Sequence, residues 1–400
     1  MKNSIKFDSF CVREVDDPRT TKPHILPIYA TSSFAFENIG EGIEVFAGSR
    51  EGHVYGRYGN PTIEAVAQKI AEMETFGLDR EAFAILFSSG MSAISSLVLG
   101  ILKKGDKILT QGNLYGGTTE LLTKIFQPFG IETIFTDLSD PGTIENFVKK
   151  DKDIRLLFCE TPANPTLACV DLEAIGLICK KYGLWSAVDN TFATPYLQQP
   201  FVFGIDFIVH STTKFLNGHG NSIAGALVGA DVDLMKTKIW TAMKLSGANC
   251  NPWDAWLVHN GMKTLALRMD RHSSNALQLS TFLEKHAKVA RVNYCGLPGH
   301  PDHSVAKKQM RQFGAMMSFE LKGGLEAGKR FMDEVRICVL APTLGDVDTL
   351  ILHPASMSHR NIDKELRLKN GITDGLIRVS VGIENIQDLI NDMEQALQKI

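Results

Sequence analysis

The sequence predicts an α/β fold in which a large domain, built on a mostly parallel sheet, is followed by a smaller α+β C-terminal domain. Short apolar runs recur between about residues 82 and 229 with helical patterns between most of them, which is typical of buried parallel strands. After residue 285 the pattern changes to strand-like pieces that end in one helix. The 400 residues are also more than one compact core usually contains.

The chain begins with weak structural signals. The first 55 residues show little periodicity, so we expect an extended N-terminal arm. Asn60 and Pro61 then predict a helix start, because Asn caps free N–H groups and Pro at the first helical position loses no hydrogen bond. Apolar residues follow at helical spacing as far as Met73, and Gly77 is the expected stop.

Strands and helices alternate from there to the C-terminus. The expected strands of the large domain lie at 82–87, 107–109, 132–136, 155–159, 184–188, 205–209 and 223–229. Residues 254–285 contain no proline and predict one long helix. The small domain is expected to have strands near 315–321, 336–340, 349–352 and 376–381 and a helix near 384–398. The predicted division is an N-terminal arm (1–55), a large domain (56–260) and a small C-terminal domain (261–400).

Composition argues against several classes of protein. Lys and Arg number 42 and Asp and Glu 45, and a net charge of −3 does not suit a nucleic-acid-binding or membrane-surface protein. Neither a transmembrane helix nor a signal peptide is expected. The seven cysteines are scattered without a CxxC pair, which predicts a reducing cytoplasm. His300 and His303 have no third ligand nearby, so no metal site is expected.

A lysine and an aspartate end two of the apolar runs. Lys214 follows the run 205–209 behind Ser211 and Thr213, where ligands gather at the carboxyl ends of strands. It could react with an aldehyde cofactor while the hydroxyls hold a phosphate, although a solvated lysine is the simpler explanation of Lys214 alone. Asp189 ends the run 184–188 and could pair with a protonated pyridine nitrogen, or merely cap a turn. Together they point to pyridoxal phosphate (PLP).

Two further segments fit a phosphorylated planar cofactor. Ser89, Gly90 and Met91 lie between a strand and a helix, where backbone N–H groups can approach an anion. The chain has no P-loop and no GxGxxG motif, which argues against ATP and dinucleotides. Tyr115 follows the next strand and could stack on a ring or pack in a turn.

A series of motifs resembles one known family. The segments 55–62, 88–91, 115–118, 160–165, 188–191, 211–214 and 353–357 resemble, in order, the signatures of the Cys/Met metabolism (transsulfuration) family of fold-type I PLP enzymes. The resemblance covers roughly residues 25–395. It implies a fold-type I PLP-transferase with pyridoxal 5'-phosphate bound covalently to Lys214.

The resemblance also implies roles for single residues. Lys214 would move protons between substrate carbons, and Tyr115 would stack on the ring and protonate the departing group. The implied cofactor-binding set is Tyr55, Arg57, Ser89, Gly90, Met91, Tyr115, Asn164, Asp189, Thr191, Ser211, Thr213 and Lys214. The implied substrate-binding set is Asn164, Thr343 and Arg378, with Arg378 as the bidentate anchor of the carboxylate. Tyr55 and Arg57 would reach the phosphate of a neighbouring subunit, which implies a homotetramer, a dimer of dimers with shared active sites.

The motifs give conflicting indications of the reaction. Residues 357–359 (Met-Ser-His) and 371–376 are most similar to the γ-lyases. Gly117 stands where methionine γ-lyases usually have cysteine, and Pro342 precedes Thr343 where cystathionine γ-lyases often have Glu-Ser. Residues 218–225 are somewhat sulfhydrylase-like.

The expected function is that of a PLP-dependent carbon–sulfur lyase that acts on sulfur amino acids by γ-elimination. It would be of the cystathionine γ-lyase or methionine γ-lyase type and yield 2-oxobutanoate, ammonia and a thiol. The alternatives are a γ-replacement enzyme (cystathionine γ-synthase or O-acetylhomoserine sulfhydrylase), cystathionine β-lyase, and a transaminase-like or non-catalytic PLP protein.

Overall fold

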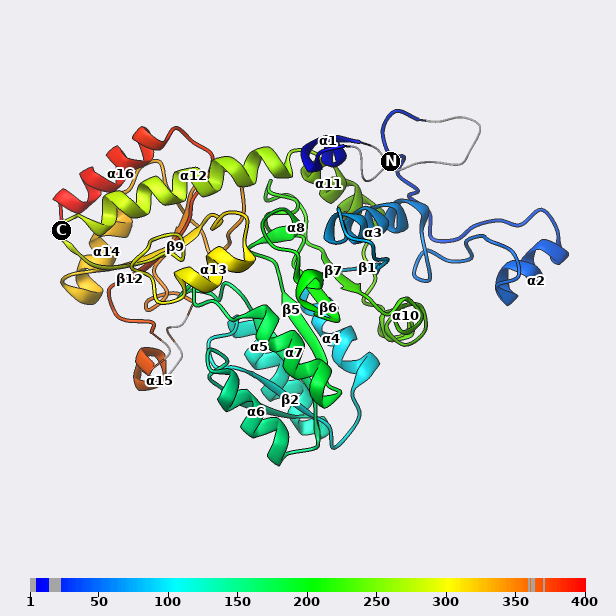
Figure 1. Cartoon of the computed structure of the whole chain (residues 1–400). Coiled ribbons are helices and arrows are strands. Elements are labelled where there is room, and N and C mark those ends of the chain that lie inside the picture. Colours follow the sequence, from blue (N-terminus) through cyan, green and yellow to red (C-terminus); the bar gives the residue numbers. More distant parts are fainter. Residues whose placement is uncertain (1–4, 14–22, 359, 361–363, 370) are drawn as a thin grey trace.

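The computed structural model describes residues 5–13, 23–358, 360, 364–369 and 371–400. His359, part of the γ-lyase-like segment, lies outside the described residues. The chain forms a seven-stranded and a five-stranded sheet with helices between and around them (Figure 1). The predicted α/β class is confirmed.

The large sheet has the strand order β1-β7-β6-β5-β4-β2-β3. Strands β2 to β6 are parallel to their neighbours within that group, whereas β7 is antiparallel to both β1 and β6. All the strands expected in this region are present. Their bounds are β1 Phe83–Phe87, β2 Lys107–Gln111, β3 Glu132–Thr136, β4 Ile154–Glu160, β5 Trp185–Asp189, β6 Phe207–His210 and β7 Gly225–Gly229.

Helices cover both faces of this sheet. Ile208 packs in one core cluster with Ile70 of α3 (Pro61–Glu74). Its neighbour Val209 packs in a second cluster with Leu97 of α4 (Gly90–Ile101), because successive strand residues point to opposite faces. The other α-helices of this region are α5 (Gly116–Glu120), α6 (Pro141–Lys150), α7 (Leu172–Tyr182), α8 (Thr194–Leu197), α9 (Val232–Leu234) and α10 (Trp240–Ser246).

Helix α3 begins as the sequence predicts. The Asn60 side chain accepts a hydrogen bond from the Thr62 N–H at 3.0 Å, and Pro61 occupies the first turn. The helix ends at Glu74, and Gly77 follows with φ +79°, a left-handed conformation that glycine adopts without strain.

The five-stranded sheet has the order β10-β11-β12-β9-β8. Its strands are β8 Val289–Asn293, β9 Met316–Leu321, β10 Val339–Leu340, β11 Leu350–Leu352 and β12 Leu376–Ser380. The helices beside it are α12 (Leu265–Glu284), α13 (His303–Gln309), α14 (Gly324–Glu334), α15 (Lys364–Lys369) and α16 (Ile386–Gln398). In Figure 1 this sheet lies to one side of the large sheet, and α12 runs alongside it.

The single helix predicted over 254–285 is wrong. The structure has α11 (Pro252–Met262) and α12, with a break at Lys263 and Thr264. Gly261 packs so closely on the Asn217 carbonyl that an added Cβ would lie 2.0 Å from that oxygen. The Gly261 carbonyl accepts a hydrogen bond from Arg268 at 2.8 Å, so a side chain takes the place of a helix donor there.

The N-terminal region contains α1 (Phe7–Val12) and α2 (Ile39–Ala47). Figure 1 shows the segment with α2 projecting away from the rest of the chain. Ile39, Ile43 and Phe46 lie on one side of α2 at helical spacing and are 82%, 63% and 68% exposed. We call these three residues the α2 stripe.

The domain boundaries stay a prediction. Among the described helices, none is long and apolar enough to cross a membrane.

Candidate active site

A cavity of about 260 Å³ lies at the carboxyl ends of the parallel strands. Its walls combine loops that follow β4, β5 and β6 with the start of α4 and with residues of the five-stranded sheet region. Predicted site residues that line it are Ser89, Gly90, Met91, Tyr115, Asn164, Asp189, Thr191, Ser211, Thr213, Lys214, Thr343 and Arg378. The structure therefore brings together residues that are far apart in the sequence.

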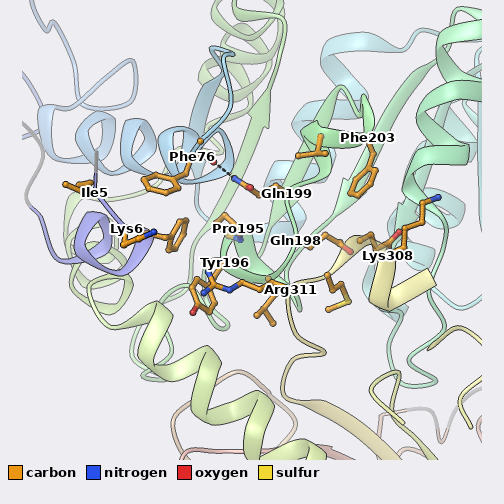
Figure 2. A pocket seen from close by; sticks show the side chains of 16 residues that line it. Ile5, Lys6, Phe76, Pro195, Tyr196, Gln198, Gln199, Phe203, Lys308 and Arg311 are labelled. Carbon is orange, nitrogen blue, oxygen red and sulfur yellow. Dashed lines mark hydrogen bonds between the residues drawn. The ribbon is translucent and has the colours of Figure 1, made fainter. Parts of the chain in front are cut away.

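A larger hollow of about 840 Å³ lies between α1, α8 and α13 (Figure 2) and contains none of the predicted site residues. Two of its cations, Lys308 and Arg311, already have partners. Lys308 pairs with Asp171 at 3.0 Å and with Glu173 at 2.6 Å, and the Arg311 guanidinium lies 4.7 Å from the centre of the Tyr196 ring. Its size alone does not make it a catalytic site.

Lys214 lies in the turn after β6 and is partly buried. Its Nζ donates a hydrogen bond to Thr343 Oγ1 at 2.8 Å. Burial lowers the pKa of Lys214, and the positive charge of Arg378 lowers it further. A lysine with a lowered pKa is more often neutral, and the neutral amine can act as a nucleophile and as a base.

Asp189 is the last residue of β5 and borders the cavity. Its Oδ1 accepts a hydrogen bond from the Thr191 N–H at 3.0 Å. Burial raises the pKa of Asp189, whereas the hydrogen bonds from Thr191 lower it. In the described part of the chain no cation forms an ion pair with this carboxylate, which leaves it available to a cationic ligand.

The start of α4 forms a cradle for an anion. Gly90 lies so close to Ser211 that an added Cβ would lie 2.9 Å from the Ser211 Cβ, so only glycine fits without a shift. The free N–H groups and the dipole of this twelve-residue helix favour a negative charge at its N-terminus. The Ser211 N–H donates to Thr191 Oγ1 at 2.8 Å, which fixes the second wall of the cradle.

Arg378 enters the cavity from β12 in the five-stranded sheet. It donates through Nη2 to the Thr343 carbonyl at 2.8 Å and through Nη1 to Asn164 Oδ1 at 3.5 Å. Burial lowers the pKa of Arg378 to about 10. No carboxylate among the described residues forms an ion pair with it, so this buried guanidinium can bind an external carboxylate.

Tyr115 lies at the mouth of the cavity and is 51% exposed. Its ring lies over Gly117, where an added Cβ would be 2.5 Å from Tyr115 Cε1. Gly117 therefore leaves room for this position of the ring, which a side chain at 117 would disturb.

Tyr55 and Arg57 do not line the cavity within this single chain. Arg57 Nη1 donates to the Lys244 carbonyl at 2.6 Å, and its guanidinium lies 5.6 Å from the Tyr55 ring centre. Their role at the site of a neighbouring subunit stays a prediction.

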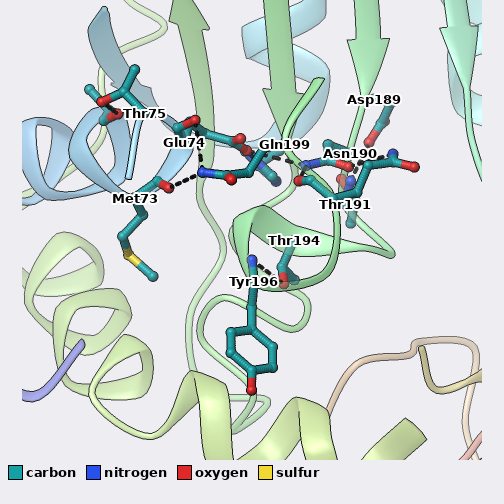
Figure 3. Close-up of polar contacts among 12 residues, drawn as sticks. Met73, Glu74, Thr75, Asp189, Asn190, Thr191, Thr194, Tyr196 and Gln199 are labelled. Carbon is teal, nitrogen blue, oxygen red and sulfur yellow. Dashed lines mark hydrogen bonds and ion pairs between the residues drawn. The ribbon is translucent and has the colours of Figure 1, made fainter. Parts of the chain in front are cut away.

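A buried polar pair, Glu74 and His210, lies at the carboxyl ends of β5 and β6. Glu74 Oε1 lies 2.5 Å from His210 Nε2, and both side chains are fully buried. The Asn190 amide donates to the same Glu74 oxygen at 3.2 Å, and Gln199 donates to the Glu74 carbonyl at 3.3 Å (Figure 3). The C-terminal end of α3 is thereby tied to the ends of β5 and β6, directly behind Asp189 and Ser211.

Sequence reasoning missed one carboxylate in the cavity. Glu160 ends β4 and lines the cavity, and it is only 5% exposed. The available signal was its place at the end of an apolar run, which is the same signal that pointed to Asp189.

Comparison with known proteins decides the family. The profile of the family described as "Cys/Met metabolism PLP-dependent enzyme" matches residues 8–398. The chain belongs to this family. The family likeness confirms the predicted PLP cofactor and an enzyme of the transsulfuration family.

The relatives within the family are named for different reactions. An "L-methionine gamma-lyase" of Fusobacterium nucleatum subsp. polymorphum is 48% identical over 94% of this chain and 93% of the relative. An "O-succinylhomoserine sulfhydrylase" of Pseudomonas aeruginosa is 38% identical over 98% and 95%. The crystal structure of a cystathionine gamma-lyase from Lactobacillus plantarum, complexed with L-serine, is similar with a TM-score of 0.90 and 36% identity, over 99% of both chains. The fold-type I class is thereby confirmed.

The residues present fit PLP. The Asp189 carboxylate, which forms an ion pair with no cation among the described residues, suits a protonated pyridine nitrogen, and the glycine-dependent cradle beside Ser211 suits a phosphate. The partly buried Lys214 amine suits an aldehyde.

Proposed function

We propose that the chain is a PLP-dependent carbon–sulfur lyase that cleaves sulfur amino acids by γ-elimination. With a methionine-type substrate and one water molecule, the products are 2-oxobutanoate, ammonia and a thiol. The observation that carries the proposal is the chain of contacts from Lys214 through Thr343 to Arg378, which joins a base to a carboxylate anchor. The 48% identity to a methionine γ-lyase supports the same reaction.

Bound PLP supplies an electron sink that stabilises negative charge on the carbons of the substrate. Asp189 would pair with the positively charged ring nitrogen, and the cradle formed by Gly90, Met91, Ser211 and Thr213 would hold the phosphate. Asn164 lines the cavity and contacts Arg378, so it would lie near both the ring and the substrate carboxylate.

Arg378 binds the substrate carboxylate with its planar fork. This contact fixes the direction of the α C–H bond relative to the Lys214 amine, and such alignment is a large part of the rate enhancement. Lys214 takes the proton from the α carbon. Burial and the charge of Arg378 lower the pKa of Lys214, which favours the neutral amine that accepts this proton.

γ-Elimination needs a second proton to leave from the β carbon before the bond between the γ carbon and sulfur breaks. Lys214 moves these protons, and Tyr115 at the mouth of the cavity donates a proton to the departing sulfur. Water then completes the release of 2-oxobutanoate and ammonia.

A γ-replacement reaction is the second candidate. The sulfhydrylase relative favours it, because that relative is 38% identical to this chain over nearly its whole length. The two reactions share the steps at the α and β carbons and differ in whether water or a thiol completes the reaction.

We propose that the protein is a cytoplasmic homotetramer with active sites shared between subunits. The exposed α2 stripe on a projecting segment supports burial against a second copy. All seven cysteines are free and buried, which suits a reducing compartment.

We also propose the large (56–260) and small (261–400) domains, because one core cluster draws its buried residues only from 276–397 and another only from 85–243.

The test of the proposed function is the visible spectrum of the protein loaded with PLP. We expect a visible absorption band that Lys214→Ala abolishes together with the release of keto acid from methionine. Lys238→Ala, at an exposed lysine outside the cavity, is the matched control and should keep both. A loaded wild-type protein without a visible band would contradict the proposal.

A further inference from the structure

Glu160 joins two loops of the cavity through one carboxylate. Its Oε2 accepts a hydrogen bond from the Tyr115 N–H at 2.8 Å, and its Oε1 accepts one from the Asn164 N–H at 2.9 Å. Tyr115 follows β2 in the chain and Asn164 follows β4, so the two loops have no direct covalent link near the site. Each oxygen of the carboxylate thus accepts a hydrogen bond from the backbone N–H of one loop.

The backbone of Glu160 is itself held in place. The Gln111 side chain at the end of β2 accepts from the Glu160 N–H and donates to the Glu160 carbonyl, both at 3.0 Å. A rigid strand end therefore carries the carboxylate, which is the support that an orienting group requires.

Stability alone does not explain a carboxylate at this position. Glu160 is in register with Asp189 on the neighbouring strand, so the two carboxylates lie on the same face of the sheet. No described cation forms an ion pair with Glu160. Burial and the charge of Asp189 raise the pKa of Glu160 to about 8, whereas its two backbone hydrogen bonds lower it. Burying two carboxylates side by side is unfavourable, which indicates that the position serves the site rather than the fold.

We propose that Glu160 is a positioning residue that fixes Tyr115 and Asn164 at the cofactor through their backbone N–H groups. The inference rests on the proposed roles of Tyr115 and Asn164 in the γ-elimination. Asp189 would hold a cationic ring, whose charge would reduce the repulsion between the two carboxylates and favour the ionised form of Glu160 that accepts both hydrogen bonds.

Glutamine cannot replace Glu160 in this role. An amide has one acceptor oxygen and one donor NH₂ group, so one of the two backbone N–H groups would face a donor. Aspartate keeps two acceptor oxygens on a shorter side chain. The order of function expected is therefore glutamate, then aspartate, then glutamine.

The experiment compares Glu160→Gln and Glu160→Asp with wild type, each loaded with PLP. We expect Glu160→Gln to keep the visible absorption band but to lose at least half of the circular dichroism in that band, because the ring loses its fixed neighbours. The kcat for 2-oxobutanoate release from methionine should fall at least tenfold, and Glu160→Asp should lie between Glu160→Gln and wild type in both measurements.

Asp206→Asn is the matched control. Asp206 also accepts a backbone N–H, from Ser186 at 2.9 Å, but it precedes β6 at the far end of the strand and does not line the cavity. This variant should keep wild-type circular dichroism and kcat per bound PLP, even if its melting temperature falls.

The outcomes separate this inference from the proposed function. Wild-type circular dichroism and kcat in Glu160→Gln would overturn the positioning role, and so would loss of PLP itself in both Glu160 variants. If Glu160→Gln does not fold, wild-type values in Glu160→Asp would overturn it. A wild-type protein with a visible band but no keto-acid release would instead contradict the proposed function.

Discussion

Single residues at the ends of strands could be predicted where their chemistry is distinctive. Lys214 and Asp189 each follow an apolar run, and the structure places both at one cavity. Glu160 follows such a run too, but its contacts to Tyr115 and Asn164 depend on the folding of two separate loops. A contact between loops leaves no periodic signal in a sequence, which is why this residue was missed.

The Glu160 carboxylate makes a prediction about pH. The pKa of Glu160 is raised from 4.5 to about 8 in the folded chain. Between these two pKa values the folded chain keeps a proton on Glu160 that the unfolded chain releases. The contribution of Glu160 to stability is therefore present below the unfolded pKa and is lost as the pH rises towards the folded pKa. Asp189 shares this titration, and its pKa is raised as well.

We expect the melting temperature of the PLP-free wild-type protein to fall more steeply from about pH 5 to about pH 8 than that of Glu160→Gln. The PLP-free form is used because a bound cation would change the charge balance at Asp189. Thermal unfolding followed by far-ultraviolet circular dichroism at several pH values measures the two slopes. Equal slopes would contradict the raised pKa as a property of the folded chain.

At the scale of elements, helices and strands were predictable where pattern and capping agree. The start of α3 at Asn60 and Pro61 is an example, since both residues fix their own backbone without help from distant contacts. The break between α11 and α12 was not predictable, because it depends on the approach of Gly261 to the distant carbonyl of Asn217. Strand β8 was missed because exposed residues interrupt its apolar pattern.

The buried contact between Glu74 of α3 and His210 of β6 leads to a prediction about stability. Removing one partner of a fully buried hydrogen-bonded pair leaves the other partner unsatisfied in the interior. We expect Glu74→Ala to lower the free energy of unfolding by about 1–3 kcal/mol, because the buried His210 loses its partner and the Asn190 amide loses one of its two acceptors.

Urea unfolding of the PLP-free protein measures this change. Glu81→Ala, at an exposed carboxylate next to β1, is the control and should change the free energy of unfolding by less than about 0.5 kcal/mol. A loss below about 1 kcal/mol in Glu74→Ala would show that the pair does not hold the strand ends together.

At the scale of the whole molecule, the sequence indicated an N-terminal arm, and the structure shows where apolar surface remains exposed. The α2 stripe is largely exposed in the described part of the chain, with the Phe46 ring centre 6.2 Å from that of Phe36, although apolar side chains are usually buried together. Tyr55 and Arg57 lie away from the cavity of their own chain, which fits a role at a neighbouring subunit.

The α2 stripe makes a prediction about assembly. We expect the double variant Ile39→Asp/Ile43→Asp to shift the protein from tetramer to smaller species in sedimentation velocity. Turnover should fall with it, because each site would lose the Tyr55 and Arg57 of its neighbour. Leu267→Asp, at an exposed leucine of α12, is the control and should stay tetrameric. A tetrameric, fully active double variant would contradict assembly through α2.

The central claim is that the site releases a thiol from the γ carbon of a sulfur amino acid. The most direct measurement is a product balance for methionine, in which 2-oxobutanoate, ammonia and methanethiol are quantified against methionine consumed. We expect one of each per methionine, with no thioether unless a competing thiol is added. A keto acid that keeps the sulfur would show amino-group transfer instead. Turnover of O-acetylhomoserine with sulfide but not of methionine would assign the site to γ-replacement and contradict the elimination.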